Sequence, residues 1–372
     1  MKICTITCHD VYNQGASLQA YALMAHLKKL GHEVEIINYK PKYLDIDYIF
    51  FAINSPQWGK NFFLKIVYLL LKIPERLGEL PIKYSFDSFR RRYMTVTAKR
   101  YASNEELRRD PPKADAYICG SDQIWNCNIP NGRDPAFYLD FAPSTALTMS
   151  YAASLAMDYI PDNLKDELRL RIGKLDHISV REFDAIQQLH DIGIARAVHV
   201  LDPVFLLEKI EWEKMAGPAP KGRYILIFCF DNENIGLDIA KKIAAIKNCP
   251  IYAANSAPLR GVDKNLGFAS PKEFLGLIRG AEYVVTNSFH AVAFALIFSV
   301  EFLAFGRTEK MNSRITNLLR SLELQEWYLP GADFDPRKLP SVNYHEAGKR
   351  IDALKERSKH FIENALRSRV NA

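Results

Sequence analysis

One histidine of this chain stands where it could give a proton to a bound anion. His290 follows a strand-like run, 283–286, and the helix-capping residues Asn287 and Ser288, and it precedes the apolar stretch 291–298. The pattern predicts a strand that leads into a helix, with His290 in the first helical turn. The free N–H groups and the dipole of that turn favour an anion, which an imidazolium can neutralise or protonate. A histidine simply held by its neighbours at a helix start is the alternative, and the pattern does not separate the two.

An arginine occupies a similar position earlier in the chain. Arg181 follows the short strand-like run 177–180 and precedes Glu182. At the carboxyl end of a strand, a guanidinium can hold a carboxylate or a phosphate through two parallel hydrogen bonds. The alternative is a structural ion pair on the surface, with Glu182 or Asp184 as the partner.

The stretch "CGSDQIWNCN" combines an aspartate with a tryptophan after another strand-like run. The Asp122 carboxylate could accept protons from sugar hydroxyls, and the Trp125 indole could stack on a sugar ring. The amides of Gln123 and Asn126 could add hydrogen bonds to the same ligand. The alternative is that Asp122 caps a helix.

The loop after the first predicted strand, "HDVYNQGAS", is rich in polar side chains. Its single glycine, Gly15, excludes the G-x-G-x-x-G fingerprint and therefore NAD. Asn13 and Gln19 could bond sugar hydroxyls, and Asp10 is a second candidate for taking up hydroxyl protons. Capping of the next helix by Asn13 or Ser17 is the alternative.

Alternating strand and helix patterns must position these residues. Two series of such patterns, separated near the linker-like stretch 217–220, predict an α/β fold with two Rossmann-like domains facing a central cleft. We assign residues 1–205 to the first domain, with a helical insertion at about 43–110, and residues 206–340 to the second. Residues 341–372 are predicted to contain a C-terminal helix that packs back on the first domain. Ligands of such sheets bind beyond the carboxyl ends of the strands.

The composition is that of a soluble globular protein. The 372 residues are 48% hydrophobic and 25% charged, with a formal charge of +6. The cluster Arg90–Arg92 is interpreted as a solvated face, because no nucleic-acid-binding motif accompanies it. The six cysteines include no C-x-x-C pair and the N-terminus has no signal-peptide pattern, so a cytoplasmic location is expected. No metal-site spacing is visible, and we expect neither a metal nor a cofactor.

The most lipophilic segment is Phe62–Ile73, "FFLKIVYLLLKI". Lys65 and Lys72 interrupt it, and it is too short to span a bilayer, which needs about 20 apolar residues. A buried helix is the favoured interpretation. The alternative is an interfacial helix that rests on the inner face of a membrane as a peripheral contact, because aromatic residues and lysines suit that boundary.

Six stretches form a recognisable series: "ITCHDVYNQGASLQAYAL", "AYICGSDQIWN", "MSYAASLA", "ISVREFD", "VLDPVFLL" and "VVTNSFHAVAFALIF". In this order they resemble the polysaccharide pyruvyl transferase family, over the chain from the first strand to about Leu324. The resemblance implies a GT-B-like fold. It also implies transfer of a pyruvyl group from phosphoenolpyruvate to a sugar, which gives a cyclic ketal and releases phosphate.

The resemblance further implies which residues bind the donor. An arginine in an S-x-R region and an R-L-H motif hold the donor in the family, and they correspond here to Arg181 and His290. This chain has Ser288 and Phe289 in place of Arg-Leu, so one positive charge is missing. Arg314 or Arg307 could supply it from a neighbouring loop. The expected donor site comprises Arg181, Asn287, Ser288, Phe289, His290 and Arg314.

The catalytic roles fall to His290 and Asp122. His290 is expected to contact the phosphate and protonate the donor, and Asp122 to take up the protons of the attacking hydroxyls. The expected acceptor is a sugar or lipid-linked oligosaccharide for a capsule or exopolysaccharide, and phosphoenolpyruvate is a substrate rather than a cofactor. Two alternatives are a GT-B glycosyltransferase that uses a nucleotide sugar and a non-catalytic glycan-binding relative. The expected acceptor site comprises Asp10, Asn13, Gly15, Gln19, Gln123, Trp125 and Asn126.

Overall fold

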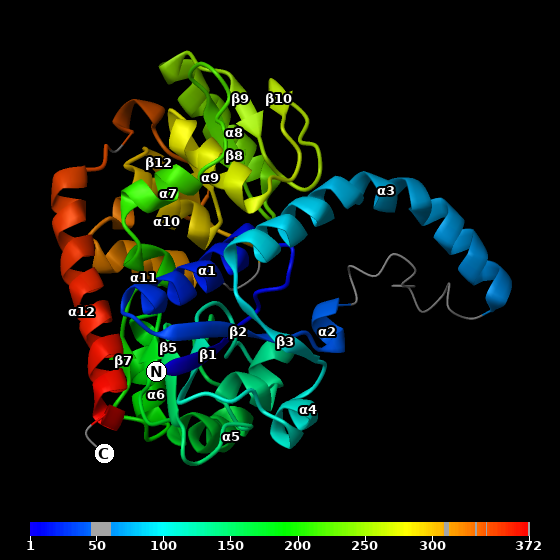
Figure 1. The fold of residues 1–372 in the computed structure, drawn as a ribbon. Helices are drawn as coiled ribbons and strands as arrows, with labels where there is room; N and C mark the ends of the chain where they lie inside the picture. Colours follow the sequence, from blue (N-terminus) through cyan, green and yellow to red (C-terminus); the bar gives the residue numbers. More distant parts are fainter. Residues whose placement is uncertain (46–60, 309–311, 332, 340, 371–372) are drawn as a thin grey trace.

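The computed structural model describes residues 1–45, 61–308, 312–331, 333–339 and 341–370. Two parallel β-sheets, each surrounded by helices, lie one above the other (Figure 1). This is the α/β architecture with two Rossmann-like domains that the alternating strand and helix patterns predict.

The first sheet has five parallel strands in the order β3-β2-β1-β4-β5. Its central strands, β1 and β4, are almost wholly buried, which explains their near-continuous apolar sequences. A separate two-stranded sheet, β6-β7, lies next to β5. The elements are β1 (Lys2–Ile6), α1 (Gln14–Lys29), β2 (Glu33–Tyr39), α2 (Lys42–Asp45), α3 (Phe62–Tyr93), β3 (Val96–Tyr101), α4 (Asn104–Arg109), β4 (Ala116–Gly120), β5 (Leu147–Tyr151), α5 (Asp162–Gly173), β6 (Ser179–Val180), α6 (Asp184–Asp191) and β7 (Val198–His199).

The predicted helical insertion at 43–110 is wrong in one respect, because it contains an edge strand of the first sheet. Residues Val96–Tyr101 form β3, which pairs with β2 in parallel. Three consecutive β3 residues, 98–100, are exposed. An edge strand with one solvated side needs little apolar character, so its basic sequence looks like a surface segment.

The second sheet has six parallel strands in the order β10-β9-β8-β11-β12-β13. Helix α10, which follows β11, is apolar on all sides and is buried along nearly its whole length. The elements are η4 (Pro203–Leu206), α7 (Lys209–Met215), β8 (Ile225–Phe228), α8 (Glu233–Lys247), β9 (Ile251–Ala253), β10 (Lys264–Asn265), α9 (Pro271–Gly280), β11 (Tyr283–Thr286), α10 (Phe289–Phe298), β12 (Phe302–Phe305), α11 (Ser313–Ser321), β13 (Tyr328–Leu329) and α12 (Tyr344–Val370).

A continuous apolar core joins the two domains. Trp212 is fully buried, and its ring lies 5.9 Å from Tyr21 of α1 and 5.0 Å from Phe294 of α10. Its indole N–H donates to the carbonyl of Val204 in η4. The packed rings fix α1 of the first domain relative to α10 of the second.

The C-terminal helix α12 runs along both domains (Figure 1). At its start, the Tyr344 hydroxyl donates to the carbonyl of Val300 in the second domain. In its middle, the Ser358 hydroxyl accepts the N–H of Leu201 at 2.9 Å. Near its end, Ser368 contacts His177 of the first domain. The helix therefore ties the second domain to the first.

Helix α3 contradicts the favoured interpretation of Phe62–Ile73 as a buried helix. Phe62 is 79% exposed, Phe63 73% and Leu70 61%. Within the described residues, no helix is long and apolar enough to cross a membrane. The segment is therefore an apolar helix on the surface. An exposed position is what the alternative interpretation, an interfacial helix, requires.

Candidate functional site

The first turns of two helices, one from each domain, meet at His290. Ser288 caps α10 by accepting the N–H of Ala291, which places His290 at the second helical position. Gly15 is the second residue of α1, and a Cβ added to it would lie 2.0 Å from Nδ1 of His290. Only glycine fits between the two helices, so Gly15 serves close packing against the imidazole rather than presenting a side chain to a ligand.

These two helix starts offer unused hydrogen-bond donors. Among the residues that the structure describes, the backbone N–H groups of 14–15 and of 289–290 have no hydrogen-bond partner. The positive ends of both helix dipoles point to the same region. Such an arrangement favours binding of an anion next to His290.

A buried aspartate lies behind the imidazole. Asp202 is 1% exposed and begins the turn η4, where one carboxylate oxygen accepts the N–H of Val204. The other oxygen accepts hydrogen bonds from Ser121 Oγ at 2.8 Å and from Arg181 Nη1 at 2.9 Å. It also lies 3.6 Å from Nε2 of His290. Burial alone would raise the pKa of Asp202, but His290 and Arg181 hold that pKa well below its usual range. The carboxylate is therefore charged, and it lies within ion-pair distance of the imidazole.

Arg181 is buried, so the predicted alternative is wrong about the surface location, but the predicted ion pair with Glu182 is present. Arg181 pairs with Asp202 and, through Nε at 3.2 Å, with Glu182. Its guanidinium carbon lies 4.3 Å from the centre of the Phe289 ring. Burial favours the neutral form, but the charges of Glu182 and Asp202 outweigh it and raise the pKa of Arg181. One terminal nitrogen, Nη2, has no hydrogen-bond partner in the described structure.

Arg314 supplies a second buried guanidinium from the start of α11. It is 8% exposed, and its Nε has no hydrogen-bond partner among the described residues. Within the same residues it makes no ion pair. Burial, and then the charge of Arg181, lower the pKa of Arg314 to about 10, although Asp122 and Glu182 oppose this. A buried cation without a close carboxylate is costly, and an anion bound beside it would offset that cost.

Arg307 differs from Arg314 in having a carboxylate partner. Its Nε lies 3.6 Å from Asp231, and its guanidinium lies over the ring of Phe230. Of the two arginines considered as replacements for the missing charge, Arg314 is the one whose charge is not already neutralised. We call Arg181, His290 and Arg314 the basic cluster.

Asp122 lies next to the basic cluster in a strained turn. Ser121 and Asp122 have φ angles of 28° and 59°, which non-glycine residues rarely adopt and which typically cost about 1–3 kcal/mol each. The Asp122 carbonyl accepts the N–H of Ser154, and no helix begins there, so the predicted helix-cap alternative is wrong. Its charge acts on both Arg181 and Arg314. Its carboxylate makes no hydrogen bond within the described residues.

The prediction that Trp125 stacks on a sugar is wrong. The indole is fully buried, donates to the carbonyl of Phe137 at 3.0 Å, and stacks on the Tyr138 ring. Asn126 is buried as well and donates to the side chain of Gln123. These residues hold the shape of the loop after β4. Of the side chains in this loop that were predicted to bind a ligand, Asp122 is the one that lies beside the basic cluster.

Asp10 is held by two basic side chains. It lies 3.0 Å from Lys40 Nζ and 2.9 Å from Arg90 of α3. Burial would raise the pKa of Asp10, but these two charges lower it below its usual value. The carboxylate anchors α3 to the loop after β1 and is a poor acceptor for a hydroxyl proton.

Three other predicted binding residues hold the backbone instead. Asn13 caps α1 by accepting the N–H of residue 16, which is the alternative that its position suggests. Gln19 is fully buried and donates to the side chain of Thr7. Asn287 bonds the backbone after β8, on Phe230 and Asp231. Ser288 alone of the predicted capping residues caps α10.

Sequence reasoning did not assign Asp202 a role. The residue lies in the stretch "VLDPVFLL", directly after β7 and before a proline. An aspartate that follows a strand at a domain boundary was the available signal. Its contact with Arg181 and His290 depends on folding together residues 181, 202 and 290, which no local pattern reveals.

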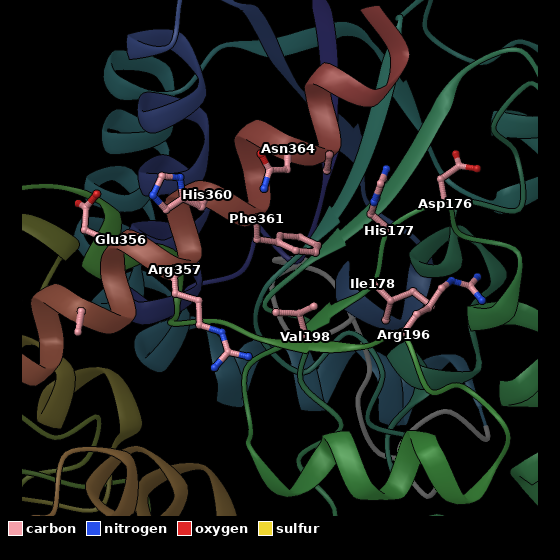
Figure 2. A pocket seen from close by; sticks show the side chains of 12 residues that line it. Asp176, His177, Ile178, Arg196, Val198, Glu356, Arg357, His360, Phe361 and Asn364 are labelled. Atoms are coloured by element: carbon pink, nitrogen blue, oxygen red, sulfur yellow. The ribbon is translucent and has the colours of Figure 1, made fainter. Parts of the chain in front are cut away.

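A separate cavity of about 670 Å³ lies under α12 (Figure 2). His177 and Ile178 line it at the start of β6, whereas Arg181 follows the other end of that strand. The cavity is therefore distinct from the basic cluster. The cavity is lined by Asp176, His177, Ile178, Arg196, Val198, Ala353, Glu356, Arg357, His360, Phe361, Asn364 and Ala365.

Within the described part of the chain, no group of three or more His, Cys, Asp or Glu side chains is placed to hold a metal ion.

A family comparison covers most of the chain. The sequence profile described as polysaccharide pyruvyl transferase matches residues 13–309. That range includes Gly15, Asp202 and His290, and it ends just before Arg314. No curated protein matches the chain in sequence.

Solved structures share the fold at low sequence identity. A Listeria monocytogenes protein described as a UDP-N-acetylglucosamine 2-epimerase is 12% identical, with a TM-score of 0.51 over 98% of this chain and 90% of its own. A UDP-GlcNAc 2-epimerase from Methanocaldococcus jannaschii is 15% identical, with a TM-score of 0.48 over 95% and 92%. AviGT4, a glycosyltransferase involved in avilamycin A biosynthesis, is 13% identical, with a TM-score of 0.47 over 100% and 99%. The first of these likenesses agrees with a GT-B-like fold of two Rossmann-like domains.

Proposed function

The chain belongs to the polysaccharide pyruvyl transferase family, and we propose that it transfers a pyruvyl group from phosphoenolpyruvate to a sugar. The acceptor is a precursor of a capsule or exopolysaccharide, free or lipid-linked. The product is a cyclic ketal, and inorganic phosphate is released. The proposed location is the cytoplasm, because the six cysteines are all buried and free.

The unpaired charge of Arg314 close to that of Arg181 carries this proposal. Phosphoenolpyruvate has both a phosphate and a carboxylate, so its site needs several positive groups close together. The basic cluster and two helix starts supply them, with donors left over on Arg181 and Arg314. Charge-assisted hydrogen bonds to each anionic group are the strongest that a protein can offer.

The Ser288-Phe289 pair is compatible with this donor. Neither residue carries a charge. Ser288 caps α10, and the ring of Phe289 lies against Arg181. Arg314 enters from α11 instead and lies close enough for the charge of Arg181 to lower its pKa. We assign Arg314 the role of the arginine that precedes leucine in the R-L-H motif.

His290 is the proposed proton donor. Nε2 faces Asp202, so Nδ1, on the side of Gly15, is the nitrogen left for the donor. Transfer of this proton to the methylene carbon of phosphoenolpyruvate leaves an oxocarbenium-like centre at the neighbouring carbon. Asp202 acts as a positioning residue, which fixes the orientation of the ring.

Asp122 is the proposed base on the acceptor side. A first sugar hydroxyl attacks the oxocarbenium-like carbon and loses its proton to the carboxylate. A second hydroxyl then displaces phosphate at the same carbon and gives its proton to the leaving phosphate, which closes the ketal ring. The proton on Asp122 is released to solvent, and His290 takes one up, so both groups return to their starting states. The partly exposed carboxylate of Asp122 lies within electrostatic range of Arg181 and Arg314, and it is free to approach an acceptor.

The test is incubation with phosphoenolpyruvate and a panel of glycans, followed by measurement of released phosphate. Acceptor-dependent phosphate release, together with a glycan heavier by one ketal-linked pyruvyl group, is the expected result. Release of UDP or GDP from a nucleotide sugar would identify a glycosyltransferase instead. Binding of a glycan without consumption of any donor would identify a non-catalytic relative.

A further inference from the structure

Most of the large apolar side chains that are exposed on the described surface lie on a single helix, α3. Single exposed apolar residues are ordinary, but a contiguous patch marks a surface that meets a partner. Phe62 and Phe63, at the start of the helix, are 79% and 73% exposed. The exposed residues are Phe62, Phe63, Ile66, Leu70, Leu71, Leu77, Leu80 and Tyr84.

Six of these residues form one stripe along the helix. Their spacings of three, four, seven, three and four residues return to the same side of a helix at each step. The stripe extends over six turns, from the start of α3 to the point where the helix joins the body of the protein. We call this set the apolar stripe: Phe63, Ile66, Leu70, Leu77, Leu80 and Tyr84.

Basic residues outnumber acidic ones along α3, which contains Lys65, Lys72, Arg76, Lys83 and Arg90–Arg92 but only Glu75, Glu79 and Asp87 as acidic residues. Lys65 and Lys72 are the charged residues of the segment 61–73, which contains no aspartate or glutamate. At the other end, α3 finishes with Arg90–Arg92. An apolar face flanked by basic groups is complementary to a lipid surface that carries negative charge.

The opposite end of α3 is firmly attached to the body. Arg90 pairs with Asp10, and the ring of Phe86 lies 5.6 Å from Tyr12 and stacks on Phe268 at 5.9 Å. Figure 1 shows the start of α3 projecting away from both sheets. The helix therefore presents its stripe at a fixed orientation to the loop after β1.

We propose that α3 docks the protein on the surface of an anionic lipid bilayer. The apolar stripe lies in the boundary between head groups and acyl chains, and Lys65 reaches the lipid phosphates. A bilayer fits better than a second copy of α3. Pro74 and Pro81 interrupt the helical hydrogen bonding, and α3 carries more basic than acidic residues, so two copies of it would repel each other. The inference stands independently of the proposed reaction.

The test is flotation of the full chain with vesicles of phosphatidylcholine, with and without an equal part of phosphatidylglycerol. The wild-type protein is expected to float with the anionic vesicles and to bind neutral ones at least about tenfold more weakly. The triple variant Phe63→Ser/Leu70→Ser/Leu77→Ser is expected to lose at least about tenfold in binding to anionic vesicles. Lys65→Glu is expected to weaken the same binding by a smaller factor.

A matched control uses apolar residues that are exposed elsewhere. Tyr159 and Leu170 are 71% and 67% exposed, outside α3, and Tyr159→Ser/Leu170→Ser is expected to bind like the wild type. Circular dichroism of each variant establishes that it is folded. Three outcomes would overturn the proposal: no flotation of the wild type, equal binding by the stripe variant, or a wild-type dimer in sedimentation that the stripe variant disperses.

Discussion

The polar residues around the loop after β1 and those of the basic cluster look alike in sequence, but their hydrogen bonding differs. Asp10 is held by Lys40 and Arg90, and the Asn13 side chain accepts the N–H of residue 16. In the basic cluster, Arg314 is buried without an ion pair among the described residues, and Nη2 of Arg181 has no hydrogen-bond partner there. Buried polar groups are normally paired. The charged groups therefore differ between the two regions, because Asp10 is neutralised by its ion pairs and helps to build the fold, whereas Arg314 has no such partner among the described residues.

The largest effect on turnover is expected at His290. His290→Ala removes the proposed proton donor, and turnover is expected to fall by about 10²–10⁴-fold, the usual contribution of general acid catalysis. Phosphate release under saturating donor measures it. Gly15→Ala, which pushes a methyl group into the imidazole, is expected to lower turnover while the protein stays folded. Turnover near the wild-type level in His290→Ala would remove the histidine from the chemistry.

Substitutions of Arg181 and of Arg314 should differ in their effect on the stability of the protein, although both arginines are buried. Arg181→Met leaves Asp202 and Glu182 without their cation, and loss of one partner of a buried pair costs about 3–5 kcal/mol of unfolding free energy. Urea unfolding of both variants measures the difference. Arg314→Met removes an unpaired charge and is expected not to lower the free energy of unfolding. Equal destabilisation by the two substitutions would show that Arg314 is a structural residue.

The same Arg314→Met variant should weaken use of the donor. A charge-assisted hydrogen bond is worth about 1.5–3 kcal/mol, so KM for phosphoenolpyruvate is expected to rise by roughly 10–100-fold. Steady-state kinetics at fixed acceptor measure the rise. Arg307, which already faces Asp231, provides the matched control, because Arg307→Met is expected to change KM less. A larger effect at Arg307 would assign the replacement charge to that residue.

The smallest effect on the reaction is expected at Trp125. The indole is buried against Tyr138, so Trp125→Phe loses one hydrogen bond, costs about 0.5–1.5 kcal/mol of stability and leaves KM for the acceptor unchanged. Chemical unfolding and acceptor titrations measure the two quantities. A large rise in the acceptor KM with unchanged stability would restore the indole to the sugar site.

The sequence predicts the fold better than the site, for physical reasons. Strand and helix patterns are local, so the two sheets and the start of α10 at Ser288 follow from periodicity. The edge strand β3 is not predicted from the sequence, because its exposed side needs no apolar residues. Asp202 is missed because its role depends on contacts between distant segments, and for the same reason the sequence offers both Arg314 and Arg307 as candidates for the missing charge. Trp125 misleads because a residue that is wholly buried by a later segment has the same sequence neighbours as one that faces solvent.

Titration calorimetry with phosphoenolpyruvate tests the central claim most directly. The account predicts that the wild-type chain binds one equivalent of phosphoenolpyruvate, that Arg314→Met loses at least about tenfold in affinity, and that Trp125→Phe binds like the wild type. Absence of binding to the wild type, or unchanged affinity in Arg314→Met, would contradict the assignment of the basic cluster as the donor site.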